Sequence, residues 1–284
     1  MNENAIQSNQ SLSPPASHFI LSTCTLWKRE MVRFLRAKNR VVGALAFPVL
    51  IWIMLGFGIN NMFKTTGAVV SYGNDSAPQA IGYLEYFFPG MLVMILLFTA
   101  IFSVISVIED RREGFLQGVL VSPASRLAIA LGKILGGASL AVGQALILTV
   151  LIYPLVGSIP SPLAIIGVAL STIIIAISLT ALGLCLAWPM DSTAAFHAIM
   201  NIFLMPMWFL CGAIFPVASA PLPMRIIMYA NPLTYGYTTI SSLLIGTDAQ
   251  QIPLPLAATI MTVFCIVLVL LAARIASKPR KDGI

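Results

Sequence analysis

The stretch ILGGASLAVGQALILTVLIYPLVGSIPSPLAIIGVALSTIIIAISLTALGLCLAWPM, residues 134–190, contains no charged side chain. A helix that crosses the hydrocarbon core of a bilayer, about 30 Å thick, needs roughly 20 apolar residues. This run is therefore too long for a single crossing. At its centre, residues 157–162 read GSIPSP, a combination of glycine and prolines that interrupts a helix. The stretch predicts a hairpin of two membrane-spanning helices.

The composition of the whole chain agrees with this prediction. Hydrophobic residues make up 58% of the 284 positions, charged residues make up 9%, and the mean hydropathy is +0.94. Soluble globular proteins carry about 25% charged residues. A chain with so little polar surface is excluded as a soluble enzyme, a secreted domain or a largely disordered protein. The predicted fold class is an all-α integral membrane protein.

Four further apolar stretches accompany the hairpin, which gives six predicted transmembrane helices. Their approximate ranges are 41–59, 87–108, 131–156, 163–187, 195–215 and 254–275. Together they define a six-helix transmembrane domain over residues 41–276.

Lysine and arginine collect on the cytoplasmic side of membrane proteins, and here their distribution is asymmetric. Residues 28–40 hold six of them, residues 111–133 hold four and residues 274–281 hold four, which leaves only Lys64 and Arg225 for the other side. Both termini are therefore predicted to be cytosolic, and six spans satisfy that. The net charge of +6 is explained by this topology, so no nucleic acid is expected as a partner.

Two kinds of segment flank the spans on the cytosolic side. Residues 1–17 and 277–284 are predicted to be cytosolic tails, the first of them disordered. Residues 18–40 predict an amphipathic interface helix, because apolar side chains and arginines fall on separate faces. The apolar face comprises Ile20, Trp27, Met31, Phe34 and Leu35, and the basic face comprises Arg29, Arg33, Arg36 and Arg40. Such a helix lies among lipid head groups. Both a topology anchor and a lever that contacts a partner fit this pattern.

The external segment 216–252, just before the last span, is cut by four prolines into apolar pieces too short to cross a bilayer. It predicts a re-entrant helical hairpin on the outer side, covered by the rest of the protein. The outer loop 60–86 is polar and carries no specific prediction.

The cytosolic loop at about 109–126 begins with EDRREGFL and contains the densest charges outside the interface helix. It fits a solvated turn. However, the positive charge of cytoplasmic loops does not require carboxylates. A simple connecting loop also has no need of apolar side chains such as Phe115 and Leu116. A short amphipathic segment with both signs of charge favours a docking surface for another protein.

Motifs for chemistry within the chain are missing. Gly132 and Lys133 lack the remaining residues of a phosphate-binding loop, and no metalloprotease or hydrolase motif occurs. The four cysteines are isolated, so no metal site is expected. Asp191 is predicted to cap the fifth span, and His197 is predicted to be a packing residue. Ionisable residues are almost absent from the spans, so no ion path is expected.

The stretch EDRREGFLQGVLVSPASRLAIALGKILG resembles the loop after the second span in membrane (permease) subunits of type 2 ATP-binding-cassette (ABC) exporters. The helix WKREMVRFLRAKNR and the segment GAIFPVASAPLPMRIIMYANPLTYGYTTI agree with the same family. The resemblance implies a non-enzymatic permease half that forms a homodimer and pairs with separate ABC ATPase subunits. Those partners would bind the ATP and magnesium, and this chain would hold no cofactor.

The resemblance also assigns roles to particular positions. Coupling to the ATPase would involve Glu109, Asp110, Arg112, Glu113, Gly114, Phe115, Leu116 and Arg126. Trp27, Arg29, Glu30 and Arg33 of the interface helix would form a second contact. Residues of the second and fifth spans would line the substrate path, namely Met91, Met94, Phe98, Phe102, Asn201, Met205, Met207 and Phe209.

These observations predict a multi-pass exporter subunit in a bacterial inner membrane. Without ionisable groups in its spans, the chain would either be passive or take its energy from a partner through the cytosolic loop. An apolar path lined by methionine and phenylalanine suits a hydrophobic or amphipathic cargo, such as a drug, a lipid or a lipid-linked glycan. An ion-driven secondary transporter and a non-transporting membrane scaffold are the alternatives.

Overall fold

A computed structural model describes residues 15–65, 82–115, 118, 125–156, 161–246 and 252–277. Every regular element in these ranges is helical. The elements are α1 (Pro15–Arg36), α2 (Lys38–Thr65), α3 (Tyr83–Arg112), α5 (Arg126–Val156), α6 (Pro162–Ala187), α7 (Thr193–Phe209), η2 (Val217–Ser219), α8 (Leu222–Ala230), α9 (Pro232–Ile245) and α10 (Leu254–Ser277).

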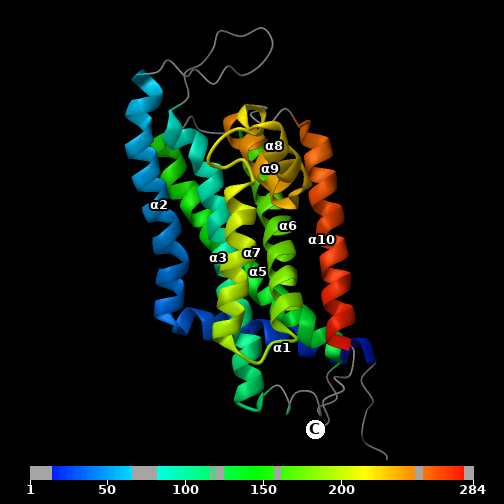
Figure 1. The fold of residues 1–284 in the computed structure, drawn as a ribbon. Helices are drawn as coiled ribbons and strands as arrows, with labels where there is room; N and C mark the ends of the chain where they lie inside the picture. Colours follow the sequence, from blue (N-terminus) through cyan, green and yellow to red (C-terminus); the bar gives the residue numbers. More distant parts are fainter. Residues whose placement is uncertain are drawn as a thin grey trace, which may run out of the picture.

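The long helices form an upright bundle with different structures at its two ends (Figure 1). Helices α2, α3, α5, α6, α7 and α10 run along the bundle, and α1 lies across one end of it. Helix α10 finishes at this same end, whereas α8 and α9 lie at the opposite end. The predicted crosswise interface helix therefore has its counterpart in α1, which begins at Pro15 and ends at Arg36 rather than spanning 18–40.

Helix α3 forms the centre of the bundle. In its most apolar window 83% of the residues are buried, compared with 22% in the corresponding windows of α2 and α10. Helices α2, α5, α6, α7 and α9 all pack against it. A displacement of α3 would therefore change its packing against most of the other helices.

Within the part of the chain that the structure describes, five helices, α2, α3, α5, α6 and α10, are long and apolar enough to cross a membrane. The predicted fifth span, 195–215, is shorter in the structure, because α7 ends at Phe209 after 17 residues. At about 1.5 Å per residue it extends roughly 25 Å. The backbone leaves the helix at the C-cap Leu210, with a φ of −96° and a ψ of 14°, and Gly212, with a φ of 92°, then turns the chain further away. The hairpin of α5 and α6 is present, and the Ser161 hydroxyl caps α6 by accepting from the Ala164 amide at 3.2 Å.

Prolines divide the segment before α10 into the short elements η2, α8 and α9. The Asn231 side chain caps α9 by accepting from the Leu233 amide at 3.0 Å, and Gly246, with a φ of 72°, ends that helix. Side chains tie the turn after α7 to α3. Tyr86 donates to the Gly212 carbonyl at 2.8 Å, and the Trp208 indole donates to the Gly90 carbonyl at 3.0 Å. The short helices were predicted; their insertion into the membrane stays a prediction.

Several predicted features lie outside the described residues. These are most of the tails, most of the outer loop 60–86 and most of the cytosolic loop after Phe115, including Leu116. Residues 15–17, predicted as part of the disordered tail, belong to α1.

Candidate functional site

Helix α1 packs closely against α5 because two glycines of α5 face it. A Cβ atom on Gly132 would lie 2.8 Å from the Leu26 Cβ, and one on Gly136 would lie 2.7 Å from the Glu30 Cβ. The Trp27 indole also donates to the Ser139 hydroxyl of α5 at 3.1 Å. Without side chains at these two positions, the backbones of α1 and α5 can approach each other.

The face of α1 that packs on the bundle differs from both faces that the sequence pattern defined. The buried residues Thr23, Leu26, Glu30 and Phe34 recur at spacings of three and four and share one face. Ile20 and Leu35, which were assigned to an apolar face, are 61% and 57% exposed. Periodicity alone missed this face because a buried charged residue, Glu30, lies at its centre.

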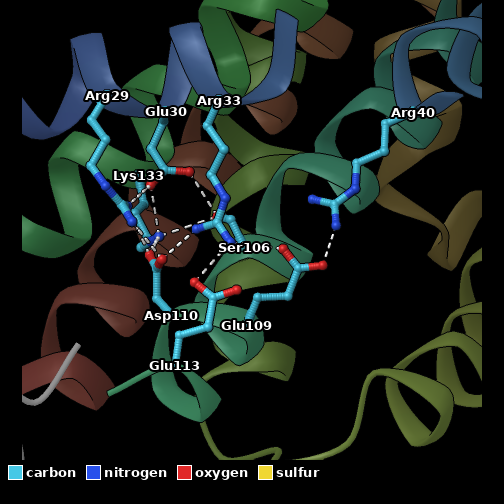
Figure 2. Close-up of polar contacts among 9 residues, drawn as sticks. All are labelled: Arg29, Glu30, Arg33, Arg40, Ser106, Glu109, Asp110, Glu113 and Lys133. Atoms are coloured by element: carbon cyan, nitrogen blue, oxygen red, sulfur yellow. Dashed lines mark hydrogen bonds and ion pairs between the residues drawn. The ribbon is translucent and has the colours of Figure 1, made fainter. Parts of the chain in front are cut away.

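A buried lysine connects the three helices at this point. Lys133 of α5 donates to the Asp110 Oδ2 atom of α3 at 2.6 Å and to the Glu30 Oε1 atom of α1 at 2.9 Å (Figure 2). The Ser106 hydroxyl accepts from Lys133 at 3.1 Å and donates to the Glu30 Oε2 atom at 2.7 Å. The Asp110 side chain is fully buried, and the Lys133 side chain is 4% exposed.

Two arginines of α1 complete the surroundings of Asp110. Arg29 forms a bidentate pair with it, from Nη2 to Oδ1 at 2.7 Å and from Nη1 to Oδ2 at 3.0 Å. Arg33 donates to the same Oδ1 atom and also reaches Glu109 at 3.0 Å. The hydrogen bond to Asp110 raises the pKa of the Arg29 guanidinium above its ordinary value, so this cation stays charged. We call Arg29, Glu30, Arg33, Ser106, Asp110 and Lys133 the Asp110 cluster.

A more exposed layer of charges borders the Asp110 cluster. Arg40, at the start of α2, donates to Glu109, and Glu113 lies 3.8 Å from Arg33. These contacts balance four cations with four carboxylates across α1, α2, α3 and α5 (Figure 2). A buried charge without its partner lowers the stability of the fold. The four helices are therefore held in the positions where these charges compensate one another.

The coupling residues predicted on α3 divide into buried and exposed groups. Asp110 is buried in its cluster and Glu109 is partly covered, whereas Arg112, Glu113 and Phe115 are exposed at the tip of α3. Gly114, with a φ of 76°, turns the chain at this tip. The Arg29 guanidinium lies 3.6 Å from the centre of the Phe115 ring, which places a cation over the ring face.

The second group of coupling residues lies on α1 and α5. Glu30 is 5% exposed and is directed into the Asp110 cluster, so its carboxylate is not offered to solvent. Trp27 is 37% exposed, and Arg126 is half-buried at the start of α5. Whether any of these residues contacts an ATPase stays a prediction.

The turn between α6 and α7 is fastened to the same end of α3. Arg111 donates to the Met190 carbonyl at 2.9 Å and to the Asp191 carboxylate at 3.1 Å. The prediction that Asp191 caps the fifth span is wrong, because the Ser192 hydroxyl caps α7 by accepting from the Ala195 amide at 3.4 Å. The Asp191 carboxylate is instead directed to Arg111 of α3.

The residues predicted to line a substrate path separate into two groups. Phe98, Phe102, Asn201 and Met205 line a shallow pocket between α3 and α7. His197, expected to pack, lies there too, with its ring 6.3 Å from that of Phe102.

The other predicted path residues lie elsewhere. Met91 and Met94 are buried in the core of the bundle, Met207 is half-buried, and Phe209 is 46% exposed. Among the described residues, no group of His, Cys, Asp or Glu is arranged to hold a metal ion.

Sequence reasoning missed the central role of Lys133. It considered this residue as part of a phosphate-binding loop, which the sequence does not complete, and gave no role to Ser106. The available signal was that Lys133 is the only charged residue of α5 after Arg126, the first residue of the helix; a lysine this far inside an apolar helix demands a carboxylate partner.

Comparisons with known proteins identify the family. A family model described as ABC-2 type transporter matches residues 22–245. The chain is also 25% identical over 231 residues to the protein named "Putative transport permease ycf38" from Cyanophora paradoxa, a match that covers 81% of this chain and 76% of that relative. The chain therefore belongs to the ABC-2 type transporter family and is a multi-pass membrane permease subunit.

Proposed function

We propose that this permease is one half of an exporter, in which two copies of the chain form the membrane path and separate ABC ATPase subunits supply the energy. The observation that carries the proposal is the Asp110 cluster, which fastens the cytosolic end of the central helix α3 to α1 and α5. ATP and magnesium would be bound by the partner and not by this chain.

The proposed docking point is the exposed tip of α3. Arg112, Glu113 and Phe115 are exposed there, whereas Asp110, one turn earlier, is held by charges from two other helices. A force on this tip would be transmitted to α1 and α5. Separating α3 from these two helices would leave the buried Asp110 carboxylate without its compensating cations. Rigid transmission of this kind turns closure of an ATPase into movement of membrane helices.

The cargo is proposed to pass beside α3 and α7, away from the cytoplasm. Their shallow pocket is formed by apolar and aromatic side chains together with the polar Asn201 and His197. Such a wall suits a hydrophobic or amphipathic molecule with a hydrogen-bonding group. The side of α7 turned away from α3 is apolar and exposed, with Ile202 at 77% and Phe203 at 55%, and a second copy of the chain could cover it. We propose that the complex resides in a bacterial inner membrane.

Gentle purification of the tagged chain from its host tests the assembly. An ABC ATPase recovered in equal amount with a homodimer of this 30.5 kDa chain is the expected result. A homodimer without ATPase after mild crosslinking would count against the exporter. It would favour an ion-driven transporter or a scaffold instead.

A charge reversal tests the docking point within the assembled complex. Glu113→Arg is expected to uncouple ATP hydrolysis from export and to leave the protein inserted, because this side chain is 64% exposed beside the proposed contact. The matched control is Asp282→Arg, the same charge reversal in the predicted cytosolic tail 277–284. Full export by Glu113→Arg, or an equal loss in Asp282→Arg, would contradict the proposed contact.

A further inference from the structure

The side of α1 that faces away from the bundle combines apolar and cationic residues. Positions 21, 28, 32, 35 and 36 recur at spacings of three, four and seven, so they share one side of the helix, opposite Thr23, Leu26, Glu30 and Phe34. On this outward side Leu21 is 66% exposed, Val32 40% and Leu35 57%. Lys28 and Arg36 are exposed between them.

The arginines and lysines of α1 are not equivalent. Arg29 and Arg33 are neutralised by Asp110 and Glu109. Lys28 and Arg36 form no ion pair with any residue that the structure describes. Glu30 is the only acidic residue in the sequence of α1, and it is buried. The outward side of α1 is thus cationic and apolar and lacks a carboxylate.

The position of α1 places this side at the membrane surface. Helix α5 has 31 residues, or about 46 Å at 1.5 Å per residue, and so exceeds the hydrocarbon thickness by roughly ten residues. Helix α1 crosses α5 near its beginning, at Gly132 and Gly136, and lies across the bundle end (Figure 1). Head groups and the upper acyl carbons would therefore surround its outward side.

We infer that Lys28 and Arg36 bind the phosphate groups of anionic phospholipids in the cytosolic leaflet, while Leu21, Val32 and Leu35 insert among the upper acyl carbons. Alternating cations and exposed aliphatic side chains match a lipid surface, which offers both phosphate and hydrocarbon at one depth. Arg29 and Arg33, the other cations in the middle of α1, take no part, because their charge is compensated within the protein. This inference does not depend on transport or on the ATPase.

Lipid binding to the purified full-length chain tests the inference. Phosphatidylglycerol and phosphatidylcholine are titrated separately, and native mass spectrometry gives an apparent Kd for each. The wild-type chain is expected to prefer phosphatidylglycerol. The double variant Lys28→Gln/Arg36→Gln is expected to weaken that binding about fivefold for each cation removed, or roughly 25-fold for the pair.

A matched double variant, Arg126→Gln/Arg274→Gln, removes the same charge from α5 and α10 and is expected to retain the preference. Melting curves of both variants verify that they are folded. Unchanged phosphatidylglycerol affinity in Lys28→Gln/Arg36→Gln would overturn the inference, as would an equal loss in the control. Loss of ATPase capture with unchanged lipid binding would also overturn it, because this side of α1 would then be a protein contact.

Discussion

At the scale of single residues, the Asp110 cluster shows how a membrane protein holds charge without exposing it to lipid. Asp110 is fully buried, and three cations from two other helices surround it. Burial opposes ionisation, but charged hydrogen bonds at 2.6 and 2.7 Å compensate for it. Removing one partner would leave an excess buried charge, which costs much more than the pair itself contributes.

Lys133→Met tests this balance. It keeps a long side chain but leaves Glu30 and Asp110 with one cation fewer, so we expect a loss of stability of about 3 kcal/mol. The measurement is the thermal unfolding midpoint of the purified protein in detergent.

The control for that variant is Lys28→Met, the same substitution at an exposed lysine, which is expected to change stability by less than about 0.5 kcal/mol. Equal midpoints for Lys133→Met and the wild type would mean that the Asp110 cluster does not stabilise the fold.

At the scale of elements, the packing of α1 against α5 depends on a close approach of the two helix backbones. The groups nearest to a Cβ atom on Gly132 would be the Leu26 Cβ at 2.8 Å and the Thr23 carbonyl at 3.2 Å. The carbonyl belongs to the α1 backbone and cannot rotate away. A methyl group here would therefore move the whole helix and stretch the contacts of Glu30 and Arg29 with α3 and α5.

Gly132→Ala is expected to destabilise the protein by about 1–3 kcal/mol through overpacking, even though alanine favours a helix by about 1 kcal/mol over glycine. Gly143→Ala in the same helix, where no atom lies within 4 Å, is expected to keep or raise stability. Unfolding midpoints provide the comparison. A stabilised Gly132→Ala would show that α1 is not closely packed in solution.

At the scale of the whole molecule, the two ends of the bundle differ in kind. One end carries α1, the Asp110 cluster and the end of α10, whereas the other carries α8 and α9 (Figure 1). The asymmetry of lysine and arginine in the sequence predicts that the first end faces the cytosol.

Labelling of single cysteines tests this orientation. In a chain whose four cysteines are replaced by alanine, Ser277→Cys at the end of α10 is expected to react with an impermeant maleimide only in inside-out vesicles. Ser219→Cys in η2 is expected to react only in spheroplasts. Both serines are exposed, so access is matched. Labelling of both from one side would contradict the orientation.

Much of the fold could be predicted because it depends on local composition. The uncharged run 134–190 required the α5–α6 hairpin, and its two helices are found. Prolines predicted the short helices before α10. The predicted end of the fifth span was wrong because the backbone leaves the helix at Leu210 and turns at Gly212, although the residues there are still apolar. Hydropathy does not detect a conformational stop of this kind.

The candidate site was predictable only in outline. The charged start of the cytosolic loop and the basic helix were both recognised as important, but Glu30 was expected at a contact with a partner, and it is 5% exposed. Lys133 was separated from Glu30 by 103 positions and from Asp110 by 23, so their meeting depended on how three helices cross.

The sequence by itself determined that this is a helical membrane protein and where most of its helices lie, and it predicts on which side of the membrane its charges gather. These properties follow from the hydrophobic effect and the surface charge of membranes, which act on each segment separately. Only the tertiary structure decided which charges are buried together and which remain free for lipid. Compensation of a buried charge depends on distances of a few ångströms between segments remote in the chain, and packing at Gly132 and Gly136 sets those distances.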